Sequence, residues 1–491
     1  MRRFFVKNIL FIIAVNVLVK TIYVFFIDRN VQNSVAGGGY GTFQALFNLS
    51  IIFQTILDFG ISSYNSRTIS QNPDKLQSIF PEMLSARLVL IVIYIGTACL
   101  FGYAYEYRGW KLLLLLGVLL AQSLNALVSF IRSNIAALQR FKTDGLLSVT
   151  DRLLMILICG FLLLYLPAGK HFKIQWFVLS LIVCYCMAAV IAYLILKRIS
   201  KITLRFSFDL PVIFKIVRQS FPYALLIFLM SVYNRADAMM IEHLHTDGAD
   251  QATIWAAAFR LLDMANILGL MFATMLLPFF GRMMSQKNDV QPIVKLCVNM
   301  MLPFSFMVAI IGIFFSGDIM HLLYHKSDVY QLSRMPAQYN IVFAILIASF
   351  PAWCLMYVYS TLLTANGSLK TLNIIAFIGV IINLSLNFYL IPHYKAAGGA
   401  ITSFITQTTL AIVFIIYASR IVKLPFNIKW MLAHIGYLLL IVLLAYGVIT
   451  VMHTAPWMLQ LLLFGIVCTG LMFVFRFVSV DSVKQLMSSS K

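Results

Sequence analysis

Long apolar segments alternate with short polar stretches along the whole chain. About 14 of these segments contain the roughly 20 residues that a helix needs to cross a bilayer. Because only helices and closed barrels can span lipid, this pattern predicts an all-α polytopic membrane protein. The expected spans are 8–27, 39–61, 84–105, 111–131, 148–168, 174–196, 220–242, 253–281, 293–316, 338–364, 371–391, 398–418, 431–451 and 457–475.

The positive residues between these spans indicate the orientation of the chain. With the N-terminus in the cytoplasm, the inside segments hold 24 Lys and Arg residues and the outside loops hold 8. Cytoplasmic loops are enriched in these residues. We therefore expect a multi-pass protein of the cytoplasmic (inner) membrane with both termini in the cytoplasm.

Short matches between the two halves of the chain indicate a repeat. Residues 165–173 resemble residues 389–395, at an offset of about 222 positions, as in transporters built from parallel repeats. We expect an N-terminal lobe of six spans (1–200), a basic cytoplasmic linker (201–219), a C-terminal lobe of six spans (220–421), and two extra helices with a tail (422–491). The linker is either an interfacial helix or a solvated loop.

Ionisable residues lie inside the seventh and eighth spans. Arg235 and Asp237 belong to the first of these, and Arg260 and Asp263 to the second. Each charge at mid-bilayer costs about 2.5–3.5 kcal/mol, so these side chains must face one another or a water-filled cavity. Arg260, Asp263 and Asn266 share one side of a helix. Arg235 is expected to face a cavity and Asp237 a neighbouring helix; two structural ion pairs are the alternative.

The first two spans also have polar stripes, which suggests that spans 1, 2, 7 and 8 line one shared cavity. Hydrogen bonding between helices would explain the Asn and Gln residues equally well. The stripes are Asn16, Lys20 and Tyr23 in the first span and Gln44, Asn48, Gln54 and Asp58 in the second.

The composition excludes several other classes of protein. The chain is 61% hydrophobic and only 11% charged, with a net charge of +20 spread between apolar segments, so we expect no nucleic-acid partner. The seven cysteines show no metal-ligand or disulfide spacing, and no phosphate-binding loop is present. No catalytic motif or large outside loop indicates an enzyme. We therefore expect no catalytic residues, no metal and no cofactor.

Several short motifs resemble those of polysaccharide-biosynthesis flippases. This family is the O-antigen and teichoic-acid exporter branch of the multidrug/oligosaccharidyl-lipid/polysaccharide exporter superfamily. The likeness runs through roughly residues 5–420. The motifs are Tyr40-Gly41, Leu57-Asp58-Phe59-Gly60-Ile61, Asn65-Ser66-Arg67, Leu138-Gln139-Arg140-Phe141, residues 233–237, Asn383 and Asn387.

The resemblance implies two six-helix lobes around a central cavity that opens alternately to each side. Its implied cargo is an oligosaccharide on a polyprenyl diphosphate, moved from the inner to the outer leaflet for surface polysaccharide assembly. Lys20, Arg235 and Arg260 would supply cations for the diphosphate. Other polysaccharide-assembly membrane proteins would be partners, besides the substrate and the membrane lipids. The remaining cavity candidates, with coupling to a proton or sodium ion as a hypothesis, are Asn16, Asn48, Asp58, Asp237, Asp263 and Asn266.

Two other functions remain as alternatives. A cation-coupled multidrug or small-molecule exporter of the related branch would use the same kind of cavity. A membrane-embedded polysaccharide polymerase would need a sizeable outside loop with polar catalytic residues, and the longest outside segment is only about 317–337. We therefore favour a lipid-linked oligosaccharide flippase.

Overall fold

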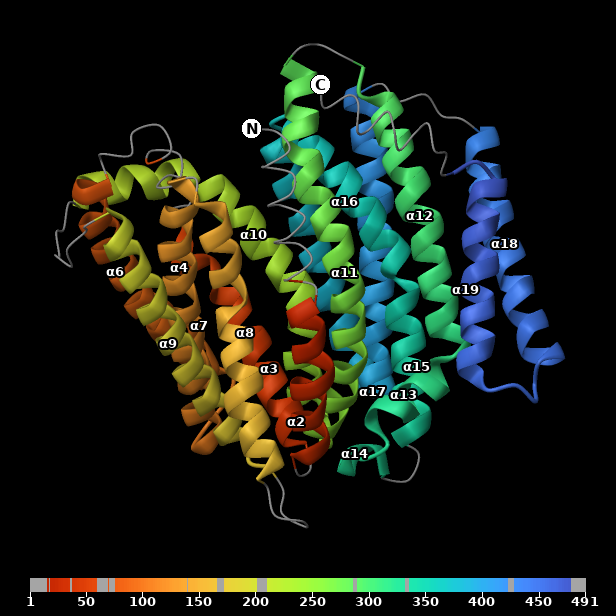
Figure 1. The fold of residues 1–491 in the computed structure, drawn as a ribbon, viewed down its shortest axis with the longest axis horizontal. Helices are drawn as coiled ribbons and strands as arrows, with labels where there is room; N and C mark the ends of the chain where they lie inside the picture. The colour runs from red at the N-terminus through yellow and green to blue at the C-terminus, as the bar shows by residue number, and fades with distance from the viewer. Residues whose placement is uncertain are drawn as a thin grey trace. The chain divides into compact units, whose positions relative to one another are not determined.

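The computed structural model describes residues 16, 18–35, 38–59, 69, 76–138, 140–165, 172–200, 210–285, 289–331, 335–422 and 428–477. All regular secondary structure in these ranges is helical (Figure 1). The predicted all-α fold class is therefore confirmed. The expected first span, 8–27, begins outside the described residues, and so does the basic linker 201–219, of which residues 201–209 are not described. Residues 210–219 of that linker are helical.

Ten helices in the described part of the chain are long and apolar enough to cross a membrane. One of them, residues 369–422, contains two expected spans, so the ten correspond to eleven of the expected segments. The other three expected segments are 8–27, 39–61 and 253–281, and the count of 14 stays a prediction.

Contacts divide the chain into two compact units. Unit 1 consists of residues 1–243, 247–253 and 326–329, and unit 2 consists of residues 244–246, 254–325 and 330–491. The chain thus passes from unit 1 to unit 2 within one long helix, between Thr253 and Ile254. The lobe boundaries expected from the sequence stay a prediction.

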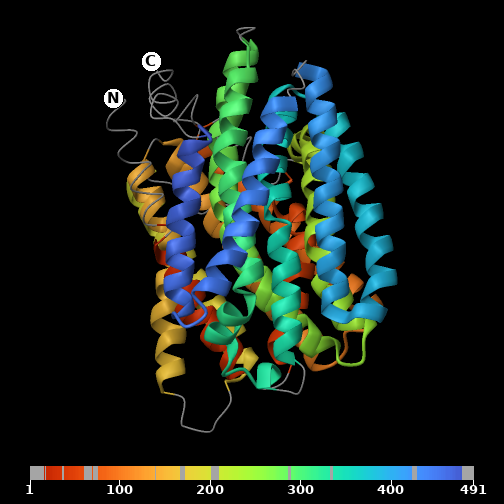
Figure 2. The same cartoon turned by 90° about the vertical axis from the view of Figure 1, so that its right-hand side faces the viewer.

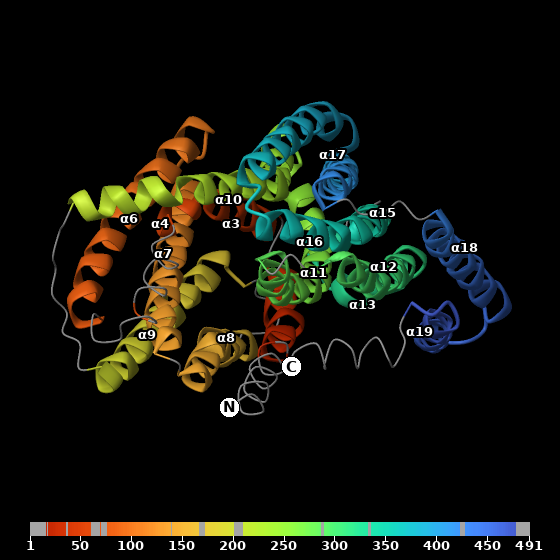
Figure 3. The same ribbon diagram turned by 90° about the horizontal axis from the view of Figure 1, so that it is seen from above.

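Unit 1 is a bundle in which α7 contacts α3, α4, α6, α8 and α9 (Figure 3). Aliphatic and aromatic side chains of α7 fill these contacts, including Leu115, Phe130 and Ile135, which are fully buried. Its helices are η1 (Tyr23–Asp28), α2 (Arg29–Ser34), α3 (Gly39–Phe53), α4 (Thr55–Asp58), α6 (Leu76–Ala104), α7 (Trp110–Ala137), α8 (Phe141–Leu164), α9 (Ile174–Ser200) and most of α10 (Leu210–Leu244).

Unit 2 is arranged around α12, which contacts α13, α15, α16, α18 and α19. Figure 2 shows its long helices lying side by side. Its helices are α11 (Gly248–Ser285, from residue 254 onward), α12 (Gln291–Phe314), α13 (Ser316–Tyr324), α15 (Met335–Ala348), α16 (Phe350–Ala365), α17 (Leu369–Val422), α18 (Ile428–Val451) and α19 (Trp457–Val474); α14 (Asp328–Gln331) lies on the division between the units.

Helix α17 is broken at Lys395, which has φ 57° and ψ −135°. An unbroken helix of 54 residues would be about 80 Å long, far more than the roughly 30 Å of a hydrocarbon core. The break separates the two expected spans 371–391 and 398–418. Gly398 is required just after it, because a Cβ there would overlap the carbonyl group of Leu390.

Candidate functional site

A group of polar side chains connects the first helix of unit 1 to α8. The Asn16 side-chain amide donates a hydrogen bond to the Ser148 hydroxyl, at 2.7 Å. One helical turn further on, Lys20 lies close enough to Arg152, Asp151 and Arg132 for each of them to act on it electrostatically. Two residues predicted from the sequence, Asn16 and Lys20, therefore belong to one cluster in unit 1.

Arg152 lies at the centre of this cluster. Its guanidinium carbon is 4.5 Å from the centroid of the Tyr23 ring, a cation–π geometry. Its Nε is 3.5 Å from a carboxylate oxygen of Asp151, and Tyr185 on α9 also acts on it electrostatically. Tyr23 begins η1, a π-helix of six residues, and such segments frequently mark functional sites.

The charged residues of α7 and α8 were not among the site residues expected from the sequence. Arg132 and Asp144 form an ion pair at 2.8 Å, with both side chains partly exposed. Asp151 and Arg152 lie inside the expected span 148–168, so the rule that identified the charges of the seventh and eighth spans would also have found them. The cluster thus contains three cations and three carboxylates: Lys20, Arg132, Arg152, Asp28, Asp144 and Asp151.

Asp58 and Asn48 lie elsewhere in unit 1. Asp58, the last residue of α4, forms an ion pair with Arg87 of α6. The Arg87 guanidinium also donates a 2.7 Å hydrogen bond to the Ala126 carbonyl and lies 5.0 Å from the Phe130 ring centroid. Asn48 is fully buried, and Gln44 donates to it at 3.5 Å. Asp58 is therefore the ion-pair partner of a buried arginine.

The charged residues of α10 and α11 have different environments. Asp237 is fully buried, whereas Arg235 is partly exposed. Arg260 is buried, and its guanidinium donates a hydrogen bond to the Tyr324 hydroxyl at 3.0 Å. Asp263 is partly exposed. The third residue of the predicted α11 face, Asn266, is buried, and neither polar atom of its side-chain amide has a hydrogen-bond partner among the described residues.

A second polar cluster in unit 1 surrounds Glu242, near the end of α10. The Glu242 carboxylate is almost fully buried and pairs with Lys111 of α7. Thr42 donates to it at 3.5 Å. Burial raises the pKa of Tyr107, and the nearby Glu242 charge raises it further; burial raises the pKa of Tyr105 to about 12. Both phenols therefore stay protonated at neutral pH.

The first turn of α11 packs tightly against the start of α3. A Cβ on Gly38 would lie 2.5 Å from the Ala249 Cβ, and one on Gly41 would overlap the Ala249 carbonyl oxygen. The side chain of Gln32 donates a 3.1 Å hydrogen bond to the Thr253 carbonyl oxygen, and both residues are buried. This contact, which we call the glycine clasp, fixes residues 249–253 to unit 1.

No group of three or more His, Cys, Asp and Glu side chains that could hold a metal ion occurs among the described residues. The cysteines there are free thiols. The polar chemistry of the site therefore comes from cations, carboxylates, amides and hydroxyls.

Solved structures of similar fold are membrane transporters. An inward-facing multidrug resistance MATE family transporter of the MOP superfamily has a TM-score of 0.64 and 14% identity, covering 82% of this chain and 94% of its own. The lipid II flippase MurJ, in an inward closed conformation, has a TM-score of 0.63 and 15% identity, with coverage of 89% and 96%. A MOP superfamily transporter from Pyrococcus furiosus has a TM-score of 0.60 and 15% identity, with coverage of 85% and 94%.

Comparison with sequence families gives two matches. The family described as MatE matches residues 222–389. No curated protein matches the chain. The family described as polysaccharide biosynthesis protein matches residues 5–284, more than half of the chain. The chain has the fold of the MOP superfamily transporters and belongs to the polysaccharide biosynthesis protein family.

Proposed function

We propose that this protein is a flippase that moves a polyprenyl-diphosphate-linked oligosaccharide from the inner to the outer leaflet of the cytoplasmic membrane. The family match and the flippase among the structures of similar fold support this proposal. Transport would proceed by alternating access, with both termini in the cytoplasm and other polysaccharide-assembly membrane proteins as partners. No catalytic step on the cargo is part of this proposal.

The observation that carries the proposal is the charged cluster of α7, α8 and the first helix. Lys20, Arg132 and Arg152 place three cations among the carboxylates of Asp28, Asp144 and Asp151, and Lys20 and Arg152 belong to expected spans. A diphosphate carries several negative charges, and charge-assisted hydrogen bonds to it are strong where water is scarce. Three cations in one cluster offer a diphosphate head the charged partners that it needs.

Arg235 and Arg260 remain candidate cations of the C-terminal helices. Arg260 also positions the Tyr324 hydroxyl, so its loss would affect packing as well as charge. Asp237, Asp263 and Asn266 remain candidates for coupling transport to a proton or sodium ion. If transport in proteoliposomes is unaffected by both gradients, the coupling hypothesis is wrong.

The test compares single substitutions in the producing cell. We expect Lys20→Ala and Arg152→Ala each to lower surface polysaccharide at least tenfold, and lipid-linked glycan to accumulate in the inner leaflet. Arg152→Lys should retain more activity than Arg152→Ala, because it keeps the charge. Lys295→Ala is the matched control, since Lys295 is an exposed cation of α12 outside the cluster.

All variants must be present in the membrane at the level of the wild type for the comparison to count. Normal polysaccharide in both Lys20→Ala and Arg152→Ala would remove the cluster from the transport pathway. If a deletion strain accumulates no lipid-linked glycan, the proposed cargo is wrong.

An exporter of drugs or other small molecules is the second candidate. The match of residues 222–389 to the MatE family and the multidrug transporter of similar fold favour it. It predicts that the deletion strain accumulates cationic drugs while its surface polysaccharide stays normal. The flippase predicts the opposite pair of results.

A further inference from the structure

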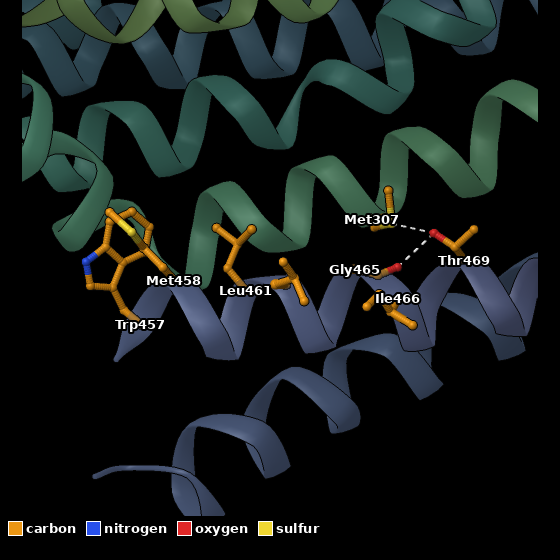
Figure 4. A pocket seen from close by; sticks show the side chains of 8 residues that line it. Met307, Trp457, Met458, Leu461, Gly465, Ile466 and Thr469 are labelled. Atoms are coloured by element: carbon orange, nitrogen blue, oxygen red, sulfur yellow. Dashed lines mark hydrogen bonds between the residues drawn. The ribbon is translucent and has the colours of Figure 1, made fainter. Parts of the chain in front are cut away.

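A groove with a volume of about 740 Å³ lies between α12 and α19 of unit 2 (Figure 4). Its position, among two helices long and apolar enough to cross the membrane, means that hydrocarbon chains surround it. Most of the lining comes from one side of α19. The lining residues are Met307, Trp457, Met458, Leu461, Leu462, Gly465, Ile466 and Thr469.

Apart from the indole N–H of Trp457 at one end, the described residues that line the groove offer a ligand no free polar side-chain group. The single lining hydroxyl, that of Thr469, donates to the Gly465 carbonyl oxygen at 2.7 Å and lies 3.9 Å from the Met307 sulfur (Figure 4). Methionine and the aliphatic side chains present a deformable apolar surface. Beyond the Trp457 end, the lining therefore favours a hydrocarbon, because a polar group there would lose its hydrogen bonds with water and gain none.

Packing on the neighbouring side of α19 explains why the groove stays open. Phe464, Cys468 and Met472 recur every four residues and are buried against α18 in a cluster that includes Tyr437 and Ile310. The Tyr437 hydroxyl also donates to the Cys468 carbonyl oxygen at 3.3 Å. These contacts hold one side of α19 against its neighbours. The adjacent side of α19 lines the groove, and its side chains, such as Leu462 and Ile466, are exposed.

The length of the groove matches one leaflet of a bilayer. From Trp457 to Thr469 the helix rises about 18 Å, and half of a hydrocarbon core is about 15 Å. Trp457 lies at the start of α19, where tryptophan prefers the membrane–water interface. One acyl chain of ordinary length therefore matches the length of the groove.

We propose that this groove binds one acyl chain of a phospholipid from the leaflet at the Trp457 end, with its headgroup beside Trp457. A polyprenyl chain is much longer than a leaflet is deep, so it matches the groove poorly. The bound lipid would fill the space that the described side chains of α12 and α19 leave open between them. This site is independent of the proposed transport function and of its charged cluster.

The test fills the groove from within. A Cβ on Gly465 meets no atom within 4 Å, so Gly465→Phe extends into open space instead of into protein. Gly470 on the same helix is equally free of neighbours and does not line the groove, which makes Gly470→Phe the matched control. The full-length proteins are purified in detergent and titrated with phosphatidylglycerol, and the bound lipid is counted by native mass spectrometry.

We expect the wild type and Gly470→Phe to retain one phospholipid each, and Gly465→Phe to bind it at least tenfold more weakly. Equal binding by Gly465→Phe and Gly470→Phe would overturn the proposal, as would preferential binding of polyprenyl phosphate over phosphatidylglycerol by the wild type. If Gly465→Phe is not recovered folded, Leu462→Trp narrows the groove from its exposed edge and should weaken binding in the same way.

Discussion

At the scale of single residues, the ion pair of Asp58 with Arg87 shows how a charge buried in the bundle is neutralised by a partner. The sequence predicted Asp58 as part of a polar stripe facing a shared cavity, and that role stays a prediction. Its partner could not be predicted, because Arg87 lies in a different helix and the pairing depends on tertiary packing. The side chain of Arg87 is only 2% exposed, whereas that of Asp58 is 43% exposed.

This difference in burial predicts an asymmetry between the two single substitutions. Asp58→Ala leaves the Arg87 charge buried and should lower the free energy of unfolding by about 3 kcal/mol, the lower end for breaking a buried pair. Arg87→Met leaves a carboxylate that can reach solvent and should lower it by only about 1 kcal/mol. Thermal unfolding followed by circular dichroism in detergent measures both.

The double variant, Asp58→Ala with Arg87→Met, is the control for coupling between the two sites. It should be no less stable than Asp58→Ala alone, because the unpaired cation is gone. An Arg87→Met protein less stable than the Asp58→Ala protein would mean that the arginine acts mainly by packing on Phe130.

At the scale of elements, hydrophobic periodicity predicted nearly every long helix of the described chain. The length of an apolar segment is enough to predict such a helix, because the backbone in lipid must satisfy its own hydrogen bonds. The break at Lys395 falls between two expected spans, 371–391 and 398–418, whereas the π-helical turn at Tyr23 was not predicted. Such a turn depends on what packs beside the helix, and no local sequence pattern specifies a neighbour.

The glycine clasp yields a prediction about the joint between α3 and α11. In Gly41→Ala the new Cβ would overlap the Ala249 carbonyl oxygen and lie 2.6 Å from the Thr253 amide nitrogen, so backbone atoms must move. Overpacking of this kind costs about 1–3 kcal/mol. We expect a lower unfolding temperature and faster proteolysis of the segment around residues 244–248.

Gly96→Ala is the matched control for this substitution. Gly96 lies on the exposed side of α6, and a Cβ there meets nothing within 4 Å. It should leave stability unchanged or raise it by about 0.5–1 kcal/mol, the usual gain of alanine over glycine in a helix. Equal losses in the two variants would show that the fit of Gly41 against α11 is unimportant.

At the scale of the whole molecule, some residues of the candidate site could be predicted from the sequence and others could not. Helical spacing alone put Asn16 and Lys20 of the first span on one side, and both lie near residues of α8. The residues around them on α7 and α8 depend on which helices pack together. The shared cavity of spans 1, 2, 7 and 8 depends on the arrangement of the two units and stays a prediction.

The membrane topology is the prediction that belongs to the whole chain. With all seven native cysteines replaced, single cysteines are placed at four exposed sites: Arg108, Arg140, Asn366 and His453. The excess of Lys and Arg in alternate loops places residues 108 and 453 outside and residues 140 and 366 inside. A membrane-impermeant maleimide should label the first two in intact cells and the other two only after lysis.

The pair Asn366 and His453 tests the interpretation of α17. If the break at Lys395 lets α17 cross the membrane twice, α17 and α18 together make three crossings, and residues 366 and 453 lie on opposite sides. A single crossing by α17 would put them on the same side. Labelling of residue 453 only after lysis would therefore contradict the two-span interpretation of α17. It would also contradict the even number of spans, since the last loop would then lie on the side opposite to the one that the Lys and Arg bias predicts.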